Sequence, residues 1–454
     1  MYKRRVKTWW TSVGNQLLET NYIQRGYQKK SIFVKQKYIT GNNTMVEIDM
    51  KRQKSMSIRL NDNRYVENAI ARVIPKLMSM EDKKVIQKQD FDIDTSVRVY
   101  SAELDELLKN IREKNEHGSL QFDTLVKEDL DFVRHDILES VSVTHPVLKT
   151  AAEYFLKRPG KLFRPMIVLL LSRCVIDIVN EDKQMDIDGI MEKERKLAEV
   201  TEIMHVASLI HDDIIDESDM RRGIPTLHKQ LKSTKIGVLG GDFLLARASI
   251  ILSKLGSLEV IEKMSTIIEH LAHGEILQIA KNKEKNEAPF DYYMRTIYFK
   301  TASIIAHSCE SAVVLANGSE EQKAAAYEFG KHLGIAYQLI DDVLDFTEEG
   351  TLIGKPSKGA DLRQGIATSP VLFAALDYPA ELNPMIKRRF SHPGDADTAM
   401  KLVEHTDSIS KTRDLAVTHC KKAVDAALRI DPSQTSPHLT GLLHLMQTIM
   451  QRRK

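Results

Sequence analysis

Cysteine, proline and glycine are all scarce in this chain. Its 454 residues contain three widely spaced cysteines, Cys174, Cys309 and Cys420, with no CxxC pair. This excludes a disulfide framework and a cysteine-based zinc site, and it suits a reducing compartment. The longest strongly apolar run, Met166 to Leu171, is far too short to span a bilayer. A hydrophobic content of 42% with 28% charged residues is instead typical of a soluble globular protein.

Net charge is also nearly absent, at +2, but it is unevenly distributed. Residues 1–46 carry nine Lys and Arg against one acid, Glu19, a local charge of +8 that leaves −6 for the rest of the chain. A mildly acidic body is a poor nucleic-acid binder, because phosphate affinity requires a basic face. Residues 1–46 have the composition of a mitochondrial targeting segment, which predicts the mitochondrial matrix. A basic tail without a specific purpose is the alternative.

Residues 119–454 are expected to form one large helical domain. Apolar residues recur there at every third or fourth position, and no sustained alternation with turn signals predicts a sheet. Residues 47–118 are polar and of mixed charge, and we interpret them as a partly disordered or accessory helical lead-in. Polar stretches predict loops at 180–194, 282–289 and 391–397, and residues 180–195 resemble an insertion between helices. The apolar helical segments are 166–178, 197–211, 236–256, 258–281, 291–316, 321–346 and 411–428.

Two acidic clusters of the form DDxxD are the strongest chemical signal. Each follows an apolar helical run, so its first and last Asp, four positions apart, share a helix face. Like charges at that spacing destabilise a helix by roughly 0.2–0.5 kcal/mol, and a helix C-terminus disfavours acids. Bound cations would offset both effects, and oxygen ligands favour Mg²⁺. A solvated acidic helix end is the alternative, and two clusters weaken it. The clusters are Asp212, Asp213 and Asp216, and Asp341, Asp342 and Asp345.

Basic residues accompany these clusters in the sequence. Any one of them alone would be an ordinary surface charge. Together with two predicted Mg²⁺ sites they indicate diphosphate binding, because Arg offers a planar fork for phosphate oxygens and Lys a point charge. They are Lys161, Arg164, Arg221, Arg222, Lys300 and Lys355.

In combination, these residues resemble the trans-polyprenyl diphosphate synthases. The similarity covers about residues 119–454, with the motifs in order and at the expected spacing. The segment around Lys355 is most similar to the mitochondrial hexaprenyl diphosphate synthases, which make the ubiquinone side chain. The signatures are Gly160-Lys161-x-x-Arg164-Pro165, His211 to Gly223, Gly241-Asp242, Lys300-Thr301, Gln338 to Asp345, Gly354-Lys355-Pro356 and Gly359 to Thr368.

The resemblance implies an all-α, isoprenoid-synthase-type domain around a deep central cavity, usually dimeric. It implies that the chain condenses isopentenyl diphosphate with an allylic diphosphate in repeated Mg²⁺-dependent steps. Its lipid product could associate the protein with the inner membrane. The implied Mg²⁺ ligands are Asp212, Asp216, Asp341 and Asp345, supported by Asp213 and Asp342. The implied allylic diphosphate site is Arg221, Lys300, Thr301, Gln338 and Lys355. The implied isopentenyl diphosphate site is Lys161, Arg164, His205 and Arg222.

His205, and the small residues that precede Asp212, can also be explained by packing alone. His205 lies two helical turns before Asp212 and could be a satisfied core histidine. The residues at 207 and 208, about 6–8 Å along the helix from Asp212, are Ala207 and Ser208. Short-chain members of the family place a bulky aromatic there as a floor, so small residues predict a long product. Close helix packing is the alternative reason for small residues.

Three other functions compete with this interpretation. A non-catalytic subunit of a heteromeric synthase would be expected to have degraded acidic motifs, and both motifs here are complete. A terpene cyclase shares the metal-triggered ionisation but usually carries a different second metal motif. A basic-tailed membrane or nucleic-acid interaction protein leaves the motifs of the helical body unexplained.

Overall fold

The computed structural model divides into two compact units, Met1–Asp82 and Lys83–Lys454. In the first unit, β1 (Val34–Ile39), β2 (Met45–Lys51) and β3 (Ser55–Arg59) form an antiparallel sheet in sequential order. These strands cross the expected boundary at residue 46, where only a targeting segment and a helical or disordered lead-in were predicted. Residues 1–33, 40–44, 52–54 and 60–121 lie outside the described residues. The structure of the second unit is described for residues 122–141, 150, 154, 162–179, 186–221, 224–279, 288–347 and 358–450.

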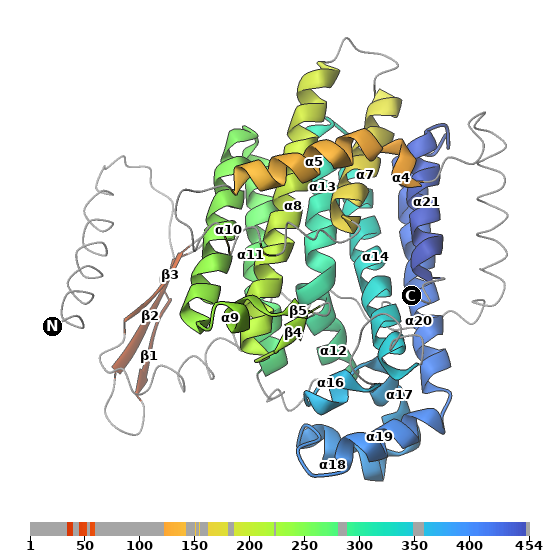
Figure 1. Ribbon diagram of the computed structural model, residues 1–454. Helices are drawn as coiled ribbons and strands as arrows, with labels where there is room; N and C mark the ends of the chain where they lie inside the picture. Colours follow the sequence, from red (N-terminus) through yellow and green to blue (C-terminus); the bar gives the residue numbers. More distant parts are fainter. Residues whose placement is uncertain are drawn as a thin grey trace. The chain divides into compact units, whose positions relative to one another are not determined.

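The second unit confirms the all-α prediction (Figure 1). Its strands β4 (Met220–Arg221) and β5 (Ile224–Pro225) form a two-residue ribbon. Its helices are α4 (Phe122–Leu125), α5 (Lys127–Ser140), α7 (Phe163–Val179), α8 (Ile187–Ile215), α9 (Leu227–Gln230), α10 (Thr234–Lys254), α11 (Leu258–Ile279), α12 (Pro289–Ile297), the π-helix η4 (Tyr298–Ala302), α13 (Ser303–Leu315), α14 (Glu320–Phe346), α16 (Ala360–Arg363), α17 (Ser369–Asp377), α18 (Pro379–Lys387), α19 (Asp395–Glu404), α20 (Ser408–Ile430) and α21 (Pro437–Met450).

Glycines allow α14 to approach α13 closely at the centre of the bundle. A Cβ atom on Gly330 would lie 2.7 Å from the Cα of Ala306, and one on Gly334 would lie 2.5 Å from the Cα of Ala302. Neither distance is compatible with a real side chain, so only glycine permits this spacing. The other face of α14 packs against α20. This packing fixes the position of the second acidic cluster along the bundle axis relative to η4.

The prediction of an insertion between helices at 180–195 is wrong for residues 187–195, which are helical. α8 begins at Ile187, and the Asp186 carboxylate caps it by accepting the backbone N–H of Gly189 at 3.0 Å. Such a cap satisfies one of the unpaired N–H groups at a helix start. Residues 187–195 are therefore the first turns of α8, while residues 180–185 lie outside the described part of the chain.

Charged residues in these first turns attach α5 to the bundle. Asp129 on α5 accepts hydrogen bonds from Arg173 at 2.6 Å and from Arg195 at 2.7 Å. Lys196 donates to Asp136, also on α5, at 2.8 Å. α5 crosses the end of the bundle that lies away from α16–α19 (Figure 1). The polar composition that predicted a loop is thus explained by ion pairs within the fold.

Buried Glu194 gives the fold a pH dependence. It is 1% exposed, and burial raises its pKa from 4.5 to about 8. Because the folded state keeps this proton while the unfolded chain loses it, stability falls as the pH rises between those two values. Glu194→Gln should therefore raise the Tm by several degrees at pH 8.5, corresponding to a free energy on the order of 3 kcal/mol. The difference should vanish near pH 4, and exposed Glu192→Gln should match the wild type in the same thermal melts.

One described helix, α10, is long and apolar enough to cross a membrane by length and composition alone. Its best window has a mean hydropathy of 1.6. The sequence expectation, which considered only unbroken apolar runs, did not identify it. Core helices of soluble proteins can meet the same criterion, and α10 packs along α8.

Candidate active site

The first acidic cluster lies at the C-terminal end of α8, beside a cavity of about 1180 Å³. Asp212, in the last turn, and Asp216, the C-cap residue, line this cavity. Asp213 is 1% exposed and is not among the lining residues. It accepts a hydrogen bond from Arg221 Nε at 2.6 Å, and Arg221 itself lines the cavity. Asp212 and Asp216 therefore face the cavity, and Asp213 holds the Arg221 guanidinium beside them.

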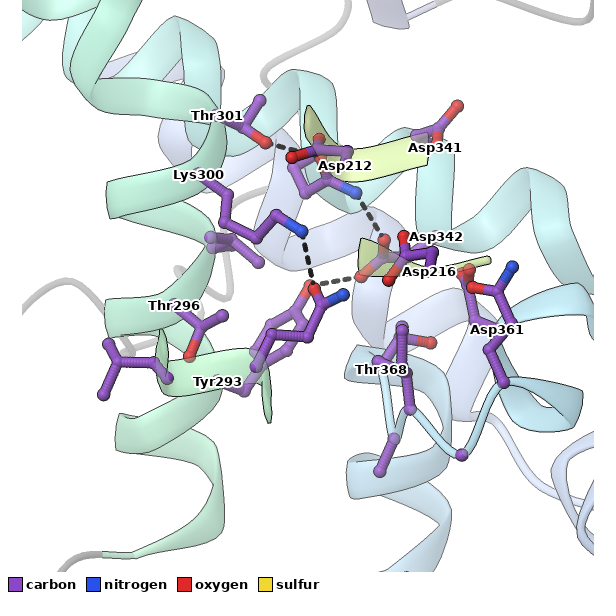
Figure 2. Close-up of a pocket in the computed structure, with 18 of the residues that line it drawn as sticks. Asp212, Asp216, Tyr293, Thr296, Lys300, Thr301, Asp341, Asp342, Asp361 and Thr368 are labelled. Atoms are coloured by element: carbon purple, nitrogen blue, oxygen red, sulfur yellow. Dashed lines mark hydrogen bonds between the residues drawn. The ribbon is translucent and has the colours of Figure 1, made fainter. Parts of the chain in front are cut away.

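The second cluster presents a different subset of its residues. Asp341 and Asp342, near the end of α14, line the cavity, whereas Asp345 does not. The Asp345 carboxylate accepts the backbone N–H groups of Ala360 and Asp361 at 3.3 and 3.2 Å. This contact anchors α16, and Asp361 lines the cavity in turn. Figure 2 shows Asp212 and Asp216 of the first cluster, Asp341 and Asp342 of the second, and Asp361 among the residues that line this cavity.

Lys300 projects from η4 toward these carboxylates (Figure 2). Its Nζ lies 2.5 Å from Glu275 Oε1 and donates to Gln278 Oε1 at 2.9 Å. π-helical turns inside α-helices are frequent at functional sites. Gly274 allows α11 to approach here, because a Cβ atom on it would lie 2.9 Å from the backbone nitrogen of Lys300. α11 thus holds the ammonium group of Lys300 through two side chains.

A chain of hydrogen bonds orients Asp342. Thr301 donates to Gln338 Oε1 at 2.8 Å, and Gln338 Nε2 donates to Asp342 Oδ1 at 2.9 Å. The hydroxyl of Tyr293 donates to the other oxygen, Asp342 Oδ2. Both oxygens of this carboxylate are therefore fixed by neighbouring side chains, which is the support that a positioned ligand group requires.

The electrostatics of the cavity favour binding of a cation. Burial raises the pKa of Asp212 and of Asp216, although the nearby Lys300 ammonium opposes this shift. Burial, followed by the charge of Asp361, raises the pKa of Asp342 to about 8. Burial, followed by the charge of Asp212, raises the pKa of Glu275 to about 7. An all-oxygen set of this kind fits a hard divalent cation, which would stabilise the charged carboxylates.

Arg164 and His205 both line the cavity, so the structure brings the predicted isopentenyl diphosphate residues that it describes to the same space. His205 is half-buried in the cavity wall. Ser208 also lines the cavity, while Ala207 is fully buried in the core and does not. Three predicted residues lie outside the described part of the chain, namely Lys161, Arg222 and Lys355.

The Gly241-Asp242 signature has a packing explanation. A Cβ atom on Gly241 would lie 2.2 Å from His211 Nε2. That ring nitrogen also lies 3.2 Å from the carbonyl oxygen of Val238 and 3.5 Å from Asp242 Oδ1. The glycine therefore leaves room for His211, which joins α10 to the end of α8 one residue before the first cluster.

Side chains that the motifs did not indicate also contribute to the site. Glu275 and Gln278 lie three positions apart on α11, which places them on one face of the helix. Only the packing of α11 against η4 brings them to Lys300. Gln278, Tyr293 and Thr368 line the cavity, and none of them was among the predicted site residues.

Comparisons with known proteins show the family of this chain. Residues 145–403 match the family model described as polyprenyl synthetase. A prenyl transferase of Cyanophora paradoxa is 41% identical over 69% of this chain and 93% of its own length. A probable mitochondrial hexaprenyl pyrophosphate synthase of Yarrowia lipolytica is 36% identical over 73% of this chain and 84% of its own. The crystal structure of a Caulobacter crescentus polyprenyl synthase, complexed with calcium and isoprenyl diphosphate, is similar with a TM-score of 0.64 and 28% identity, covering 73% of this chain and 97% of that one. The chain belongs to the polyprenyl synthetase family.

Proposed function

We propose that the protein is a prenyltransferase that makes a long all-trans polyprenyl diphosphate, of about C30 or longer, for the ubiquinone side chain. It condenses isopentenyl diphosphate with an allylic diphosphate such as farnesyl diphosphate in repeated head-to-tail steps. The observation that carries this proposal is that Asp212, Asp216, Asp341, Asp342 and Lys300 all line the same cavity. The alternative, a non-catalytic subunit of a heteromeric synthase, would not require this complete set of acidic and basic groups.

The residues fit Mg²⁺, which would be held by Asp212, Asp216, Asp341 and Asp342, with Asp361 beside them. When bound, it would neutralise the diphosphate and support its departure. Asp345, which the resemblance includes among the ligands, would act on this geometry by holding the start of α16.

Other side chains of the cavity would bind the two diphosphate substrates. Lys300 and Arg221 stabilise the negative charge that develops on the departing diphosphate, in a partly buried site where such charges interact strongly. Arg164 and His205 hold isopentenyl diphosphate so that its double bond attacks the allylic cation. The departed diphosphate takes the proton that leaves in the last step.

Product length is proposed to depend on the residues before Asp212. Ser208 lines the cavity, and Ala207 is buried directly beside it in sequence. Ser208→Phe should shorten the product by one or more isoprene units, because the ring fills the space below the allylic end. Ala207→Phe should act in the same direction with an added packing cost of about 1–3 kcal/mol. Chromatography of the extracted lipids measures both, and an unchanged product with Ser208→Phe contradicts the proposal.

A homodimer is proposed from the apolar surface of two contacting helices, α10 and α11. Leu239 and Ile250 on α10 are 59% and 47% exposed, and Leu258 and Ile276 on α11 are 83% and 48% exposed. A second copy covering this face would remove these side chains from water. Sedimentation should find a dimer that Ile250→Glu dissociates at micromolar concentration. Leu376→Glu, which alters an exposed leucine on α17, should remain dimeric.

The proposed location is the mitochondrial matrix, with contact to the inner membrane through the lipid product. The basic composition of residues 1–46 supports this, as does the mitochondrial designation of the Yarrowia lipolytica relative. Fluorescence of a carboxy-terminal fusion should coincide with a mitochondrial marker and become diffuse when residues 1–46 are deleted.

The decisive experiment incubates the full-length protein with labelled isopentenyl diphosphate, farnesyl diphosphate and Mg²⁺. Label should appear in an extractable lipid of the C30 class or longer, and a chelator should abolish its formation. Parallel reactions with Ca²⁺ and Mn²⁺ test the preference for Mg²⁺. Absence of extractable label from the protein alone would favour the heteromeric-subunit alternative.

A further inference from the structure

Arg389 follows α18 in an unusual backbone conformation. Arg389 and Phe390 have φ angles of 57° and 51°, so two consecutive non-glycine residues occupy the left-handed region, which L-residues rarely adopt. Their N–H groups donate to the carbonyl oxygens of Ile386 at 3.0 Å and Met385 at 2.9 Å. Phe390 is buried in the small core beneath. The turn therefore directs the Arg389 side chain away from that core, and Arg389 lines the cavity.

The Arg389 guanidinium bridges two separate segments. Nη2 donates to the carbonyl oxygen of Gln278 at 3.1 Å, and Nη1 donates to that of Ile279 at 3.2 Å. Nε donates to the carbonyl oxygen of Gly365 at 3.3 Å. Gln278 and Ile279 end α11, where carbonyl groups have no partner within the helix. A positive charge at this end also complements the helix dipole.

Only a glycine fits at position 365, next to the backbone of Arg389. Gly365 has a φ of 81°, and a Cβ atom on it would lie 2.9 Å from the carbonyl oxygen of Arg389. The segment from Gly365 to Thr368 lines the cavity. Gln278, on the other side of the bridge, accepts a hydrogen bond from Lys300. Arg389 thus connects the end of α11, which holds Lys300, with the opposite cavity wall.

We infer that Arg389 is a positioning residue for the transfer reaction. By clasping the end of α11 to the segment 365–368, its guanidinium fixes Gln278 and therefore the Lys300 ammonium where the allylic diphosphate binds. This role rests on the proposed function of Lys300. It requires the planar three-donor fork of arginine, which a lysine ammonium does not reproduce.

The test compares Arg389→Gln and Arg389→Lys with the neighbouring control Arg388→Gln. Arg388 binds Asp395 through two hydrogen bonds of 2.7 and 2.6 Å and does not line the cavity. Full-length proteins are assayed with farnesyl diphosphate, isopentenyl diphosphate and Mg²⁺. Arg389→Gln should raise the KM for farnesyl diphosphate about tenfold with a smaller fall in kcat, and Arg389→Lys should recover only part of the loss. Arg388→Gln should stay within twofold of the wild type.

Hydrogen exchange supplies a readout that does not require turnover. Amides at the end of α11 should exchange faster in Arg389→Gln than in the wild type or in Arg388→Gln. Kinetics of Arg389→Gln that match Arg388→Gln, full recovery by Arg389→Lys, or unchanged α11 exchange would each overturn the inference. If Arg389→Gln does not fold, Arg389→Lys is judged by the same two measurements. A wild type without activity would instead contradict the proposed function, and the exchange experiment would still test the clasp.

Discussion

Asp212→Asn is expected to lower kcat/KM for isopentenyl transfer about a thousandfold, corresponding to several kcal/mol of lost charge stabilisation. Asparagine keeps the size of the side chain and one carbonyl oxygen but removes the negative charge. Asp212 lines the cavity within the field of Lys300, so the change removes a ligand charge where a divalent cation would bind. The Mg²⁺ concentration for half-maximal activity should rise as well.

Two variants separate this effect from a general loss of acidity. Exposed Glu217→Gln, outside the cavity lining, removes one charge nearby and should leave kcat/KM within twofold. Asp213→Asn weakens the 2.6 Å hydrogen bond from Arg221 and should mainly raise the KM for the allylic diphosphate. Asp212→Asn retaining more than a tenth of wild-type activity would contradict a metal-ligand role for this residue.

Lys300→Met should be the second most damaging change, with a fall in kcat of about 10²–10³-fold. The methionine occupies a similar volume without the ammonium that would stabilise the departing diphosphate. It also leaves Glu275, Asp212 and Asp216 without their nearest cation. The variant should therefore lose activity when Mg²⁺ is present, and it should lose thermal stability when Mg²⁺ is absent.

A double variant separates these two losses. In Lys300→Met/Glu275→Gln the carboxylate that paired with the ammonium is gone, so the Tm should return toward that of the wild type. Activity should remain low, because the cation for the diphosphate is still missing. Recovery of kcat in the double variant would show that Lys300 acts only by neutralising Glu275.

The helical architecture was predictable because its signal is local. Apolar spacing alone located α7, α10, α11, α14 and α20 to within three residues at each end, and it gave α12, η4 and α13 as one continuous segment. The clear failure was at residues 187–195, where a charged composition indicated a loop. Arg195 and the adjacent Lys196 pair with α5, and a contact between distant segments leaves no local pattern.

The candidate site was predictable only to the level of its motifs. Spacing correctly placed Asp212 and Asp216 on one face, but it could not give the rotation of each helix about its own axis. That rotation makes Asp213 bind Arg221, whereas Asp342 faces the cavity. Glu275 was missed for a related reason, because its partnership with Lys300 depends on the close approach of α11 and η4 at Gly274.

The contacts of Asp345 hold the start of α16 in place, whatever the number of residues between α14 and α16. Its carboxylate binds the N–H groups of Ala360 and Asp361, and its carbonyl oxygen accepts the N–H of Gly359 at 2.8 Å. The chain therefore leaves α14 and returns to the residue from which it departed. Since closing a longer stretch of chain costs little additional free energy, the number of residues between α14 and α16 can change in evolution while Asp361 stays in place.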